Sequence, residues 1–387
     1  MHIAVIGAGA VGLATARELA VRGNRVTVIE ASRPGAGTTG TTFAWVNSHG
    51  KEPQSYFELN LAGLRAHHEL DAALGGGPRW FRPTGNLEWA TAPEHAEALR
   101  TRAARLRERG YAVREPTPAQ ARELEPGARI PDGAGAVAFF PAEGHVLTGE
   151  FLARMLTDAL ACGAVLRCPA RVAEVAPRPG GVRLLLEDGS AVQADAAVTA
   201  AGRWTEALTA TAGHPVPMAG PEAPGSAAVG HLGYTAPAPV RLERVLTTGR
   251  LNVRPDGGGR LVLQGLDLDA DADPAAAPAP RVAEALRERL AEVLVGGAFA
   301  EVAEVRVGRR ALPADGLTVC GFAAPDARLY TIATHSGITL APALARWAAE
   351  EILDGTERPE LAGFRPGRFR GGRPDVHLTQ ARLPGRQ

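Results

Sequence analysis

The stretch HIAVIGAGAVGLATARELAVRGNRVTVIE, residues 2–30, decides the fold of this chain. Its two apolar runs predict buried strands, joined by a helix that begins in a glycine-rich turn. In that turn Gly7, Gly9 and Gly12 form the pattern Gly-x-Gly-x-x-Gly, and Glu30 ends the second strand. The N-terminus of such a helix suits a pyrophosphate, and the acid suits both hydroxyls of a ribose. The stretch therefore predicts a Rossmann-like α/β domain that binds a dinucleotide, and Glu30 argues against NADP but leaves NAD and FAD open.

The loop that follows, PGAGTTGTTFAWVNSHGKEP at residues 34–53, is rich in threonine and glycine. Its hydroxyl groups and backbone amides are suited to close over the second phosphate and to lead the chain toward an isoalloxazine ring. An ordinary surface loop explains the same composition equally well. The loop alone therefore leaves the choice of cofactor open.

Bulk composition excludes several classes of function. A chain of 387 residues with 45% hydrophobic and 22% charged residues predicts a globular protein of about two domains. The zero formal net charge offers no electrostatic argument for a nucleic-acid partner. Cys162, Cys168 and Cys320 have neither disulfide-framework nor zinc-like spacing, so we expect no metal and a reducing compartment. A strand already at His2 leaves no room for a signal peptide, and no apolar run reaches about 18 residues. We expect a cytoplasmic protein without a membrane anchor, for which an oligomer is possible.

The rest of the chain shows further regular elements. Residues 143–168 predict a turn, an amphipathic helix and a strand, and residues 282–294 predict a second amphipathic helix. The strands on either side of 256–259 predict an antiparallel hairpin. The low-complexity stretch LDLDADADPAAAPAP predicts an exposed loop at 266–280. The arginine-rich residues 366–387 predict an extended or disordered tail.

Four blocks resemble the glycine oxidase/D-amino-acid oxidase (DAO) superfamily of FAD-dependent amine oxidoreductases. They are VIGAGAVGLATARELA…VTVIE, GTTFAWVNS, VTAAGRWT, and GRRALPADGLTVCG followed by LYTIATHSGITLAP. The blocks occur in the family's order along nearly the whole chain. The end block carries the most specific match, at Gly308, Arg310, Asp315, Gly316, Gly321, Gly337, Ile338, Leu340, Ala341 and Pro342.

The resemblance implies an interleaved two-domain architecture. Residues 1–75, 141–205 and 301–365 are expected to form the FAD-binding domain, of the glutathione-reductase type. Residues 76–140 and 206–300 are expected to form an antiparallel-sheet substrate domain that covers the flavin.

The resemblance also implies FAD as the cofactor and a helix that starts near Gly337 against the flavin. A helix N-terminus there stabilises negative charge on the flavin through free amides and the dipole. Capping of that helix by Thr334 or Ser336 is the alternative interpretation. The residues expected to bind FAD are Ile6, Gly7, Gly9, Ala10, Val11, Gly12, Glu30, Ala31, Thr41, Thr42, Phe43, Ala44, Val172, Gly202, Trp204, Gly308, Gly337, Ile338, Thr339 and Leu340.

Substrate contacts follow from the resemblance as well. Arg310 is expected to hold the carboxylate of an amino acid as a bidentate fork, with a structural ion pair, for example to Asp315, as the alternative. His335 is expected near the flavin, where it could assist catalysis. Asn252 and Arg254, expected on opposite faces of one strand, are further candidates for substrate contact. Lys51, the only lysine of the chain, is the last candidate, with a cation that could aid oxygen reduction.

Departures from the family pattern limit which substrates and which type of flavin attachment are expected. The helix start HSG is short and lacks an arginine that glycine oxidase carries, and Asn252 replaces a tyrosine. Glycine is therefore a doubtful substrate, and a larger or less ordinary amine is expected. Gly308 and Ala44 occupy the places where relatives link FAD covalently, so noncovalent FAD is expected.

The implied reaction oxidises the C–N bond of an amine or amino acid to an imine and passes the electrons to oxygen or another acceptor. Two alternatives remain open at this point. One is a flavin monooxygenase of the hydroxylase type, although its typical Gly-Asp-Ala-like block is not found. The other is an FAD-binding protein without turnover.

Overall fold

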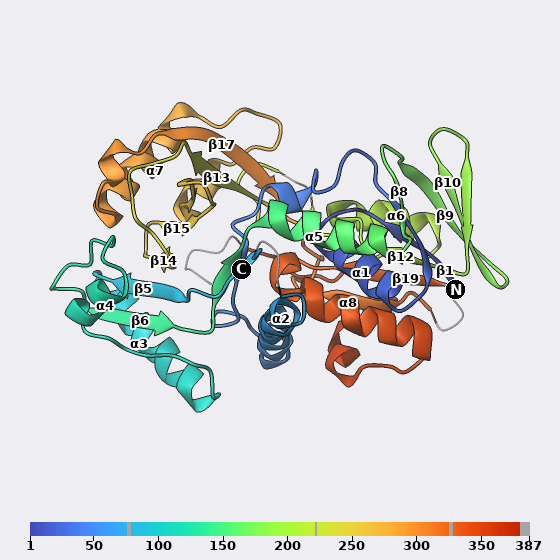
Figure 1. The fold of residues 1–387 in the computed structure, drawn as a ribbon, viewed down its shortest axis with the longest axis horizontal. Helices are drawn as coiled ribbons and strands as arrows, with labels where there is room; N and C mark the ends of the chain where they lie inside the picture. The colour runs from blue at the N-terminus through green and yellow to red at the C-terminus, as the bar shows by residue number, and fades with distance from the viewer. Residues whose placement is uncertain (76–78, 221–222, 325–327, 380–387) are drawn as a thin grey trace.

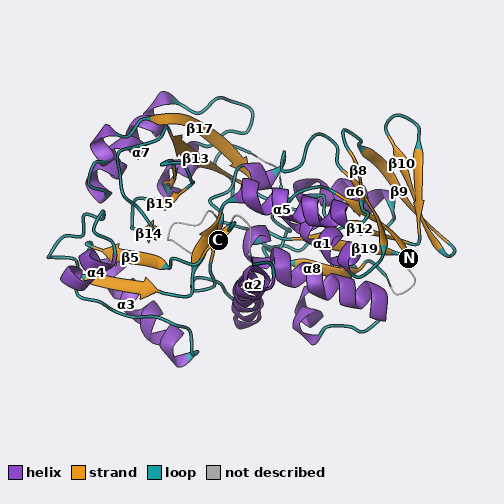
Figure 2. Ribbon diagram, viewed as in Figure 1, coloured by secondary structure: helices purple, strands orange, loops and turns teal. Residues whose placement is uncertain are grey.

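The computed structural model describes residues 1–75, 79–220, 223–324 and 328–379. Two sheets of different kind lie in two halves of the molecule (Figure 1). One half holds a mainly parallel sheet with helices, and the other holds a larger, mainly antiparallel sheet (Figure 2). The predicted α/β fold with a separate antiparallel sheet is confirmed.

The parallel sheet is built around the N-terminal strand. Its order is β18-β19-β12-β1-β2-β8, and only the edge strand β18 runs antiparallel. The central strands are almost continuously apolar, because both faces of the sheet are covered. The strands are β18 (Val319–Phe322), β19 (Leu329–Ala333), β12 (Ala196–Thr199), β1 (His2–Ile6), β2 (Arg25–Ile29) and β8 (Val165–Arg167).

Helices cover one face of this sheet and a small sheet covers the other. Helix α1 (Ala10–Val21) lies between α5 (Thr148–Ala161) and α8 (Gly337–Asp354). Small residues dominate the buried face of α1, and they allow the three helices to approach closely. On the opposite face, residues of β1 and β2 share a core with the antiparallel strands β9 (Val172–Arg178), β10 (Gly181–Leu186) and β11 (Ala191–Ala194).

The second large sheet has the order β17-β13-β16-β15-β14-β5-β6. Leucines of α7 (Pro280–Val293) pack on its apolar face, and α3 (Pro93–Glu108) packs beside β6. The short α4 (Pro118–Leu124) lies nearby in Figure 1. The strands are β17 (Val302–Arg309), β13 (Val229–Thr235), β16 (Leu261–Gln264), β15 (Asn252–Pro255), β14 (Val245–Thr247), β5 (Asn86–Ala90) and β6 (Ala136–Phe140).

Further helices, a small sheet and 3-10 turns complete the fold. Helix α2 (Gln54–Ala73) packs against α8, and α6 (Thr205–Thr211) follows β12. A small antiparallel sheet consists of β3 (Trp45–Val46), β7 (Gly144–Val146) and β4 (Phe81–Arg82). The 3-10 turns are η1 (Thr38–Gly40), η2 (Gly202–Trp204), η3 (Leu266–Asp271), η4 (Gly297–Phe299), η5 (Pro359–Phe364) and η6 (Pro366–Phe369).

The predicted hairpin is confirmed, since β15 pairs antiparallel with β16 around residues 256–260. Three other predictions differ from the structure. Strand β17 pairs with β13. Residues 302–309 therefore lie in the antiparallel sheet and not with the segments expected to bind FAD. The rest of the predicted domain division stays a prediction. The exposed loop predicted at 266–280 is wrong for its first residues, because η3 buries Asp269.

The tail prediction is also wrong in its first part. Residues 366–369 form η6, and the ring of Phe369 is buried against residues of β18, β19 and the segment after α6. Arg368 forms an ion pair with Asp315, and Arg373 forms one with Glu206. Aromatic burial and these pairs hold the segment on the parallel sheet. Residues 380–387 of the predicted tail lie outside the described residues.

In the part of the chain that the structure describes, no helix is long and apolar enough to cross a membrane. The same residues contain no group of three or more histidines, cysteines or acids arranged to hold a metal ion.

Candidate functional site

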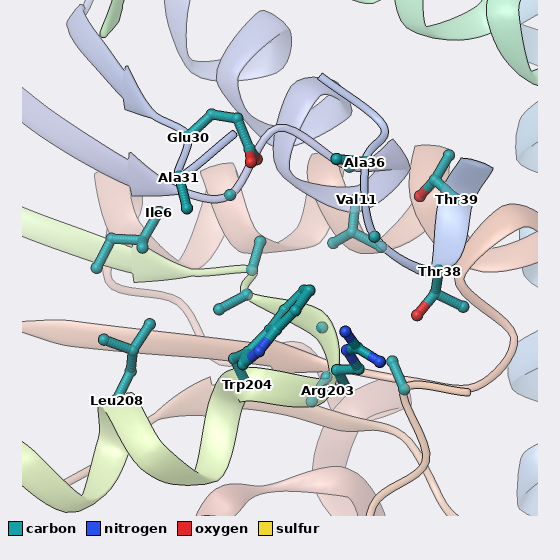
Figure 3. Close-up of a pocket in the computed structure, with 18 of the residues that line it drawn as sticks. Ile6, Val11, Glu30, Ala31, Ala36, Thr38, Thr39, Arg203, Trp204 and Leu208 are labelled. Carbon is teal, nitrogen blue, oxygen red and sulfur yellow. The ribbon is translucent and has the colours of Figure 1, made fainter. Parts of the chain in front are cut away.

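Two adjoining cavities lie where the parallel sheet meets the antiparallel sheet. The larger one has a volume of about 680 Å³ and runs along the carboxyl ends of β1, β2, β12 and β19 (Figure 3). The smaller one has a volume of about 90 Å³ and is bordered by β13 and β17. Thr38, Thr42, His335 and Ile338 border both. We call them the dinucleotide cavity and the inner cavity.

The glycine-rich turn forms one wall of the dinucleotide cavity, and its glycines are required by close packing. Gly7 has a φ of +104°, and a Cβ there would lie 2.5 Å from the carbonyl oxygen of Ala200. A Cβ on Gly12 would overlap the carbonyl oxygen of Gly7. Gly12 therefore shapes the turn without bordering the cavity, whereas Gly7 and Gly9 border it.

The threonine-rich loop folds back onto the same turn. The Thr39 hydroxyl accepts a hydrogen bond from the N–H of Ala10 at 3.1 Å, and Thr38 donates to the carbonyl of Arg309 at 2.7 Å. Thr38, Thr39 and Thr42 all border the dinucleotide cavity. The loop is therefore part of the cavity wall and not a separate surface loop.

Glu30 stands at the end of β2 with its carboxylate on the cavity (Figure 3). One oxygen accepts the N–H of Ala8 at 2.8 Å, and the other accepts the N–H of Ser32 at 2.9 Å. These two bonds fix the carboxylate, and each oxygen keeps further lone pairs for a ligand. The position suits the predicted contact with ribose hydroxyls.

The opposite wall comes from β9 and the turn after β12. Gly202 adopts a φ of +58°, and the ring of Trp204 is 43% exposed and reaches the cavity. The Arg203 guanidinium lies 4.1 Å from the centre of that ring. A Cβ on Gly37 would lie 3.3 Å from the ring, so glycine lets the loop pass close to it. Sequence reasoning missed Ala36, Arg203 and Leu208 on this cavity, because nothing in their local pattern marks them.

Helix α8 begins at Gly337, which borders the dinucleotide cavity together with Ile338. Ser336 is the N-cap but makes no capping hydrogen bond, because its hydroxyl is paired with that of Tyr56 at 2.8 Å. The Thr334 hydroxyl accepts the N–H of Ser336, one residue before the helix. Ser336 therefore does not cap the helix, and Thr334 takes an amide that precedes it. Gly337 and Ile338 border the dinucleotide cavity, and Ile338 and Thr339 border the inner cavity.

One predicted amide donor is wrong. The N–H of Leu340 donates to the carbonyl of Ser336 at 2.9 Å inside the helix, and Leu340 borders neither cavity. The free amides of a helix N-terminus end within its first turn, and Leu340 lies just beyond it.

The start of α8 is braced by α2. Pro342 has no N–H to donate to the carbonyl of Ile338, and His67 Nε2 donates to that carbonyl at 2.7 Å. Burial lowers the pKa of His67 to about 4, so the imidazole is neutral at physiological pH. A Cβ on Gly63 would lie 2.6 Å from the carbonyl oxygen of Thr339, so glycine allows the close approach of the two helices.

The dinucleotide cavity fits FAD. Its volume, its length along four strand ends, the glycine cradle that a Cβ would fill and the uncapped start of α8 all suit an elongated, anionic cofactor. The predicted FAD residues that border it are Ile6, Gly7, Gly9, Ala10, Val11, Glu30, Ala31, Thr42, Val172, Gly202, Trp204, Gly337 and Ile338.

The inner cavity is bordered by most of the remaining predicted residues. Predicted residues on its wall are Thr41, Thr42, Phe43, Ala44, Lys51, Gly308, Arg310, His335, Ile338 and Thr339. Sequence reasoning missed Asn47, His231 and Gln264 there. Only their three-dimensional placement marks them.

Asn252 and Arg254 do not border the inner cavity. Asn252 donates to the side chain of Gln264 at 3.2 Å, and Arg254 donates to the carbonyl of Phe43 and pairs with Asp256 at 2.7 Å. The expectation that the two lie on opposite faces is wrong, because residues two apart in a strand share a face. Both support residues of the cavity wall.

Arg310 has a partner that the sequence did not indicate. Its Nη2 lies 2.8 Å from Oδ2 of Asp269, and its Nη1 donates to the carbonyls of Ala227 at 2.8 Å and Val229 at 2.6 Å. Asp315, the partner considered from the sequence, pairs instead with Arg368 at 2.7 Å. Desolvation raises the pKa of Asp269, and the neighbouring Arg310 opposes that rise. The role of Arg310 toward a substrate stays a prediction.

Lys51 is 5% exposed on the wall of the inner cavity. Burial lowers the pKa of its ammonium to about 8, against the opposing attraction of Glu143. Glu143 is fully buried, and its carboxylate accepts from Tyr111 at 2.6 Å and from Trp45 at 3.0 Å. His49 Nδ1 lies 2.7 Å from the same carboxylate.

Comparison with known proteins gives a consistent result. A family model described as FAD dependent oxidoreductase (DAO) matches residues 2–351. D-proline dehydrogenase of Pyrobaculum islandicum is 28% identical over 96% of this chain and all of that protein. Mitochondrial dimethylglycine dehydrogenase of Rattus norvegicus is 27% identical over 52% of this chain, but the match spans only 23% of that longer protein. The crystal structure of glycine oxidase from Geobacillus kaustophilus superposes with a TM-score of 0.80 at 23% identity, over 94% of this chain and 97% of that one.

Proposed function

The chain belongs to the family of FAD-dependent oxidoreductases, and from this premise we propose that it oxidises the C–N bond of an amino acid or related amine to an imine. The observation that supports the proposal most is the start of α8, where Gly337 and Ile338 border the dinucleotide cavity and Ile338 and Thr339 border the inner cavity. Relatives named as glycine oxidase and D-proline dehydrogenase act on amino acids, which supports the same class of substrate.

Separate parts of the site would hold the cofactor. The glycine-rich turn would take the pyrophosphate, Glu30 the ribose of the adenosine half, and the N-terminus of α8 the electron-rich edge of the flavin. FAD, when bound, supplies the acceptor for the hydride equivalent that leaves the carbon beside the amine. The chain itself orients the substrate and excludes water, and positioning of this kind accounts for much of the rate of such a reaction.

The inner cavity would hold the substrate. His335 borders both cavities, so it is the side chain best placed to contact a substrate amine beside the flavin. We expect it to assist by hydrogen bonding.

We propose that FAD is bound noncovalently. Gly308 and Ala44, which occupy the places where relatives attach the cofactor, carry no nucleophilic side chain and border the inner cavity. Acid precipitation should release all of the flavin into the supernatant. Flavin that remains on the denatured chain would contradict this assignment.

Two further proposals concern the cellular compartment and the domain division. The three cysteines are unpaired, and Cys320 is buried beside Tyr330, which suits a reducing cytoplasm. The two sheets support a division into an FAD-binding part and a substrate part, with β17 assigned to the latter.

The experiment that tests the function is anaerobic reduction of the purified flavoprotein by a panel of amino acids, N-methyl amino acids and simple amines. An amine oxidoreductase loses its visible flavin absorption on addition of its substrate, without a nicotinamide cofactor. Reduction that requires NADH or NADPH would point to a hydroxylase instead. No reduction by any member of the panel would point to an FAD-binding protein without turnover.

A further inference from the structure

We propose that His231 is the general base of the inner cavity, whose Nε2 accepts an N–H of the substrate amine and takes the proton that the amine must lose before its C–N bond is oxidised. The inference rests on the proposed function and assigns a catalytic residue to the same site. Three observations carry it: the hydrogen bond that fixes the ring of His231, the open Nε2, and a cavity wall whose described residues include no carboxylate.

One hydrogen bond fixes the tautomer of His231. Its Nδ1 lies 3.0 Å from the carbonyl oxygen of Leu268 in η3. A carbonyl oxygen can only accept a hydrogen bond, so Nδ1 carries the hydrogen. In the neutral imidazole the distal nitrogen, Nε2, then carries the lone pair. The fold therefore presents His231 in the form that can accept a proton at Nε2.

The backbone of His231 is held on two sides. The residue stands opposite Val307 where β13 pairs with β17, and its N–H donates to Oδ1 of Asp269 at 2.7 Å. Asp269 belongs to η3, as Leu268 does, and its other oxygen lies 2.8 Å from Arg310. Because η3 contacts both the backbone and the ring of His231, the position of the ring is fixed before a ligand binds.

The distal nitrogen of His231 is open to a ligand. In the part of the chain that the structure describes, Nε2 has no hydrogen-bond partner, and it is not one of the unpaired polar atoms that are closed off from solvent. His231 borders the inner cavity and not the dinucleotide cavity, whereas His335 borders both. Nε2 of His231 is therefore an acceptor on the substrate side of the site, and a ligand N–H would satisfy it.

The charges on the cavity wall disfavour an ammonium. Lys51, Arg309 and Arg310 border the inner cavity, and no acid is among the described residues that do. Asp269, which pairs with Arg310, and Glu143, which attracts Lys51, lie behind the wall. A substrate ammonium would find no counter-charge on this wall, and that favours the neutral amine.

The proposed step is a proton transfer. One N–H bond of the substrate ammonium breaks, the proton bonds to Nε2 of His231, and the electron pair stays on the amine nitrogen. This pair forms the C=N bond when the hydride equivalent leaves the neighbouring carbon, so the product is a protonated imine. His231 is restored when its proton passes to water.

Two probes of the same shape test the acceptor without turnover. 2-Aminoisobutyrate has no hydrogen on the carbon beside its amine, so it cannot be oxidised, and pivalate carries a methyl group in place of that amine. Each is titrated against the visible spectrum of the FAD-loaded protein at pH 7. The wild type should bind 2-aminoisobutyrate more tightly than pivalate by about tenfold or more, as expected for a hydrogen bond to a charged group.

His231→Asn separates the base from a structural role. The side-chain N–H of asparagine can keep the bond to Leu268, but the distal nitrogen is lost. The variant should keep its flavin content, lower the preference for 2-aminoisobutyrate by about tenfold, and change the Kd of pivalate by less than about threefold. His335→Asn serves as the comparison, because it removes the other histidine of the cavity wall that borders the flavin side.

The rate of anaerobic flavin reduction by a substrate from the panel gives a second readout. At pH 7, His231→Asn should reduce its flavin about 100-fold more slowly than the wild type, which is the usual size of general-base catalysis. This gap should narrow by up to about tenfold per pH unit as the pH rises toward the pKa of the amine, because free amine needs no base. The other charged or titratable groups at this site are common to both proteins, so the gap isolates His231. They are Asp269 in η3, Arg309, Arg310, His335, and Lys51, the pKa of which burial lowers to about 8.

Three outcomes would overturn the proposal: a wild type that lacks the preference or binds neither probe, a preference that His231→Asn retains, or a rate gap that does not narrow as the pH rises. Loss of the preference in His335→Asn alone would assign the acceptor to that residue instead. The anaerobic reduction panel judges the proposed function separately, because binding of 2-aminoisobutyrate requires no turnover. A flavoprotein that no amine reduces, but whose preference depends on His231, would refute the function and keep His231 as the amine-binding residue.

Discussion

Replacing Lys51 with methionine should stabilise the FAD-loaded, substrate-free protein at pH 7. The ammonium is buried, and its pKa falls from 10.5 to about 8, chiefly through desolvation. A lysine whose pKa is lowered on folding binds its proton more tightly in the unfolded chain, so the bound proton favours unfolding. The destabilisation is fully present below pH 8, declines between pH 8 and 10.5, and is absent above that range.

The size of the effect follows from the shift. A drop from 10.5 to about 8 corresponds to roughly 3 kcal/mol at pH 7, at 1.36 kcal/mol per pKa unit. Methionine keeps the length of the side chain and removes the charge, so most of this should appear as added stability. For a chain of 387 residues the entropy of unfolding is about 0.8 kcal/mol/K, which makes the rise in Tm roughly 4 °C.

Thermal unfolding of both proteins at a series of pH values from 7 to 10.5 measures the effect. The variant should unfold at the higher temperature at pH 7, and the two curves should converge as the pH approaches 10.5. Arg260→Met serves as the control, because it removes an exposed cation and should change stability by less than about 0.5 kcal/mol at every pH. A variant less stable than the wild type at pH 7, or a gain that does not depend on pH, would refute the reasoning.

Three further substitutions probe other parts of the site. Gly12→Ala should yield folded protein with little bound flavin, because the new Cβ meets a backbone carbonyl, whereas Gly149→Ala, with open space around it, should keep full flavin content. Glu30→Gln should raise the Kd of FAD by about 10- to 100-fold, because the charge-assisted hydrogen bonds expected between the carboxylate and the ribose are worth about 1.5–3 kcal/mol. Recovery of flavin fluorescence on dilution measures this Kd, and an unchanged Kd would exclude the ribose contact. Asp269→Asn should lower stability by about 3 kcal/mol, because it leaves a buried guanidinium without its counter-charge, while Asp271→Asn in an exposed pair should change it by less than about 1 kcal/mol. Equal loss of stability in both aspartate variants would contradict that reasoning.

The parts of the site that the sequence predicted are those encoded by local sterics. The spacing of Gly7, Gly9 and Gly12 follows from one turn of backbone, and Glu30 follows from the length of one helix and one strand. The start of α8 is local in the same sense, because glycine before an apolar helix marks an N-terminus that backbone can approach. Such features can be predicted without knowledge of the rest of the fold.

The missed features depend on contacts between distant segments. Asp269 lies in an acidic, low-complexity stretch that predicts an exposed loop, and only its pairing with Arg310 explains its burial. Phe369 similarly lies in an arginine-rich segment, and its burial depends on β18 and β19. Glu143 lies in a short turn without any motif, yet side chains from two distant segments, Trp45 and His49 in one and Tyr111 in the other, contact its carboxylate. The composition of a segment predicts its average exposure, but whether one charged side chain is buried depends on a partner elsewhere in the chain.

The same contrast bears on how the site distinguishes its ligands. The N-terminus of α8 provides positive potential from backbone dipoles, and His67 holds that backbone in place at the point where Pro342 lacks a donor. This potential does not titrate, which suits a cofactor that stays bound. Lys51 provides positive charge from a side chain whose pKa burial lowers to about 8, so this charge declines as the pH rises through that value. Arg310 carries a permanent charge that is paired with Asp269 at 2.8 Å. The site therefore combines a dipole that does not titrate with a lysine whose charge declines above about pH 8.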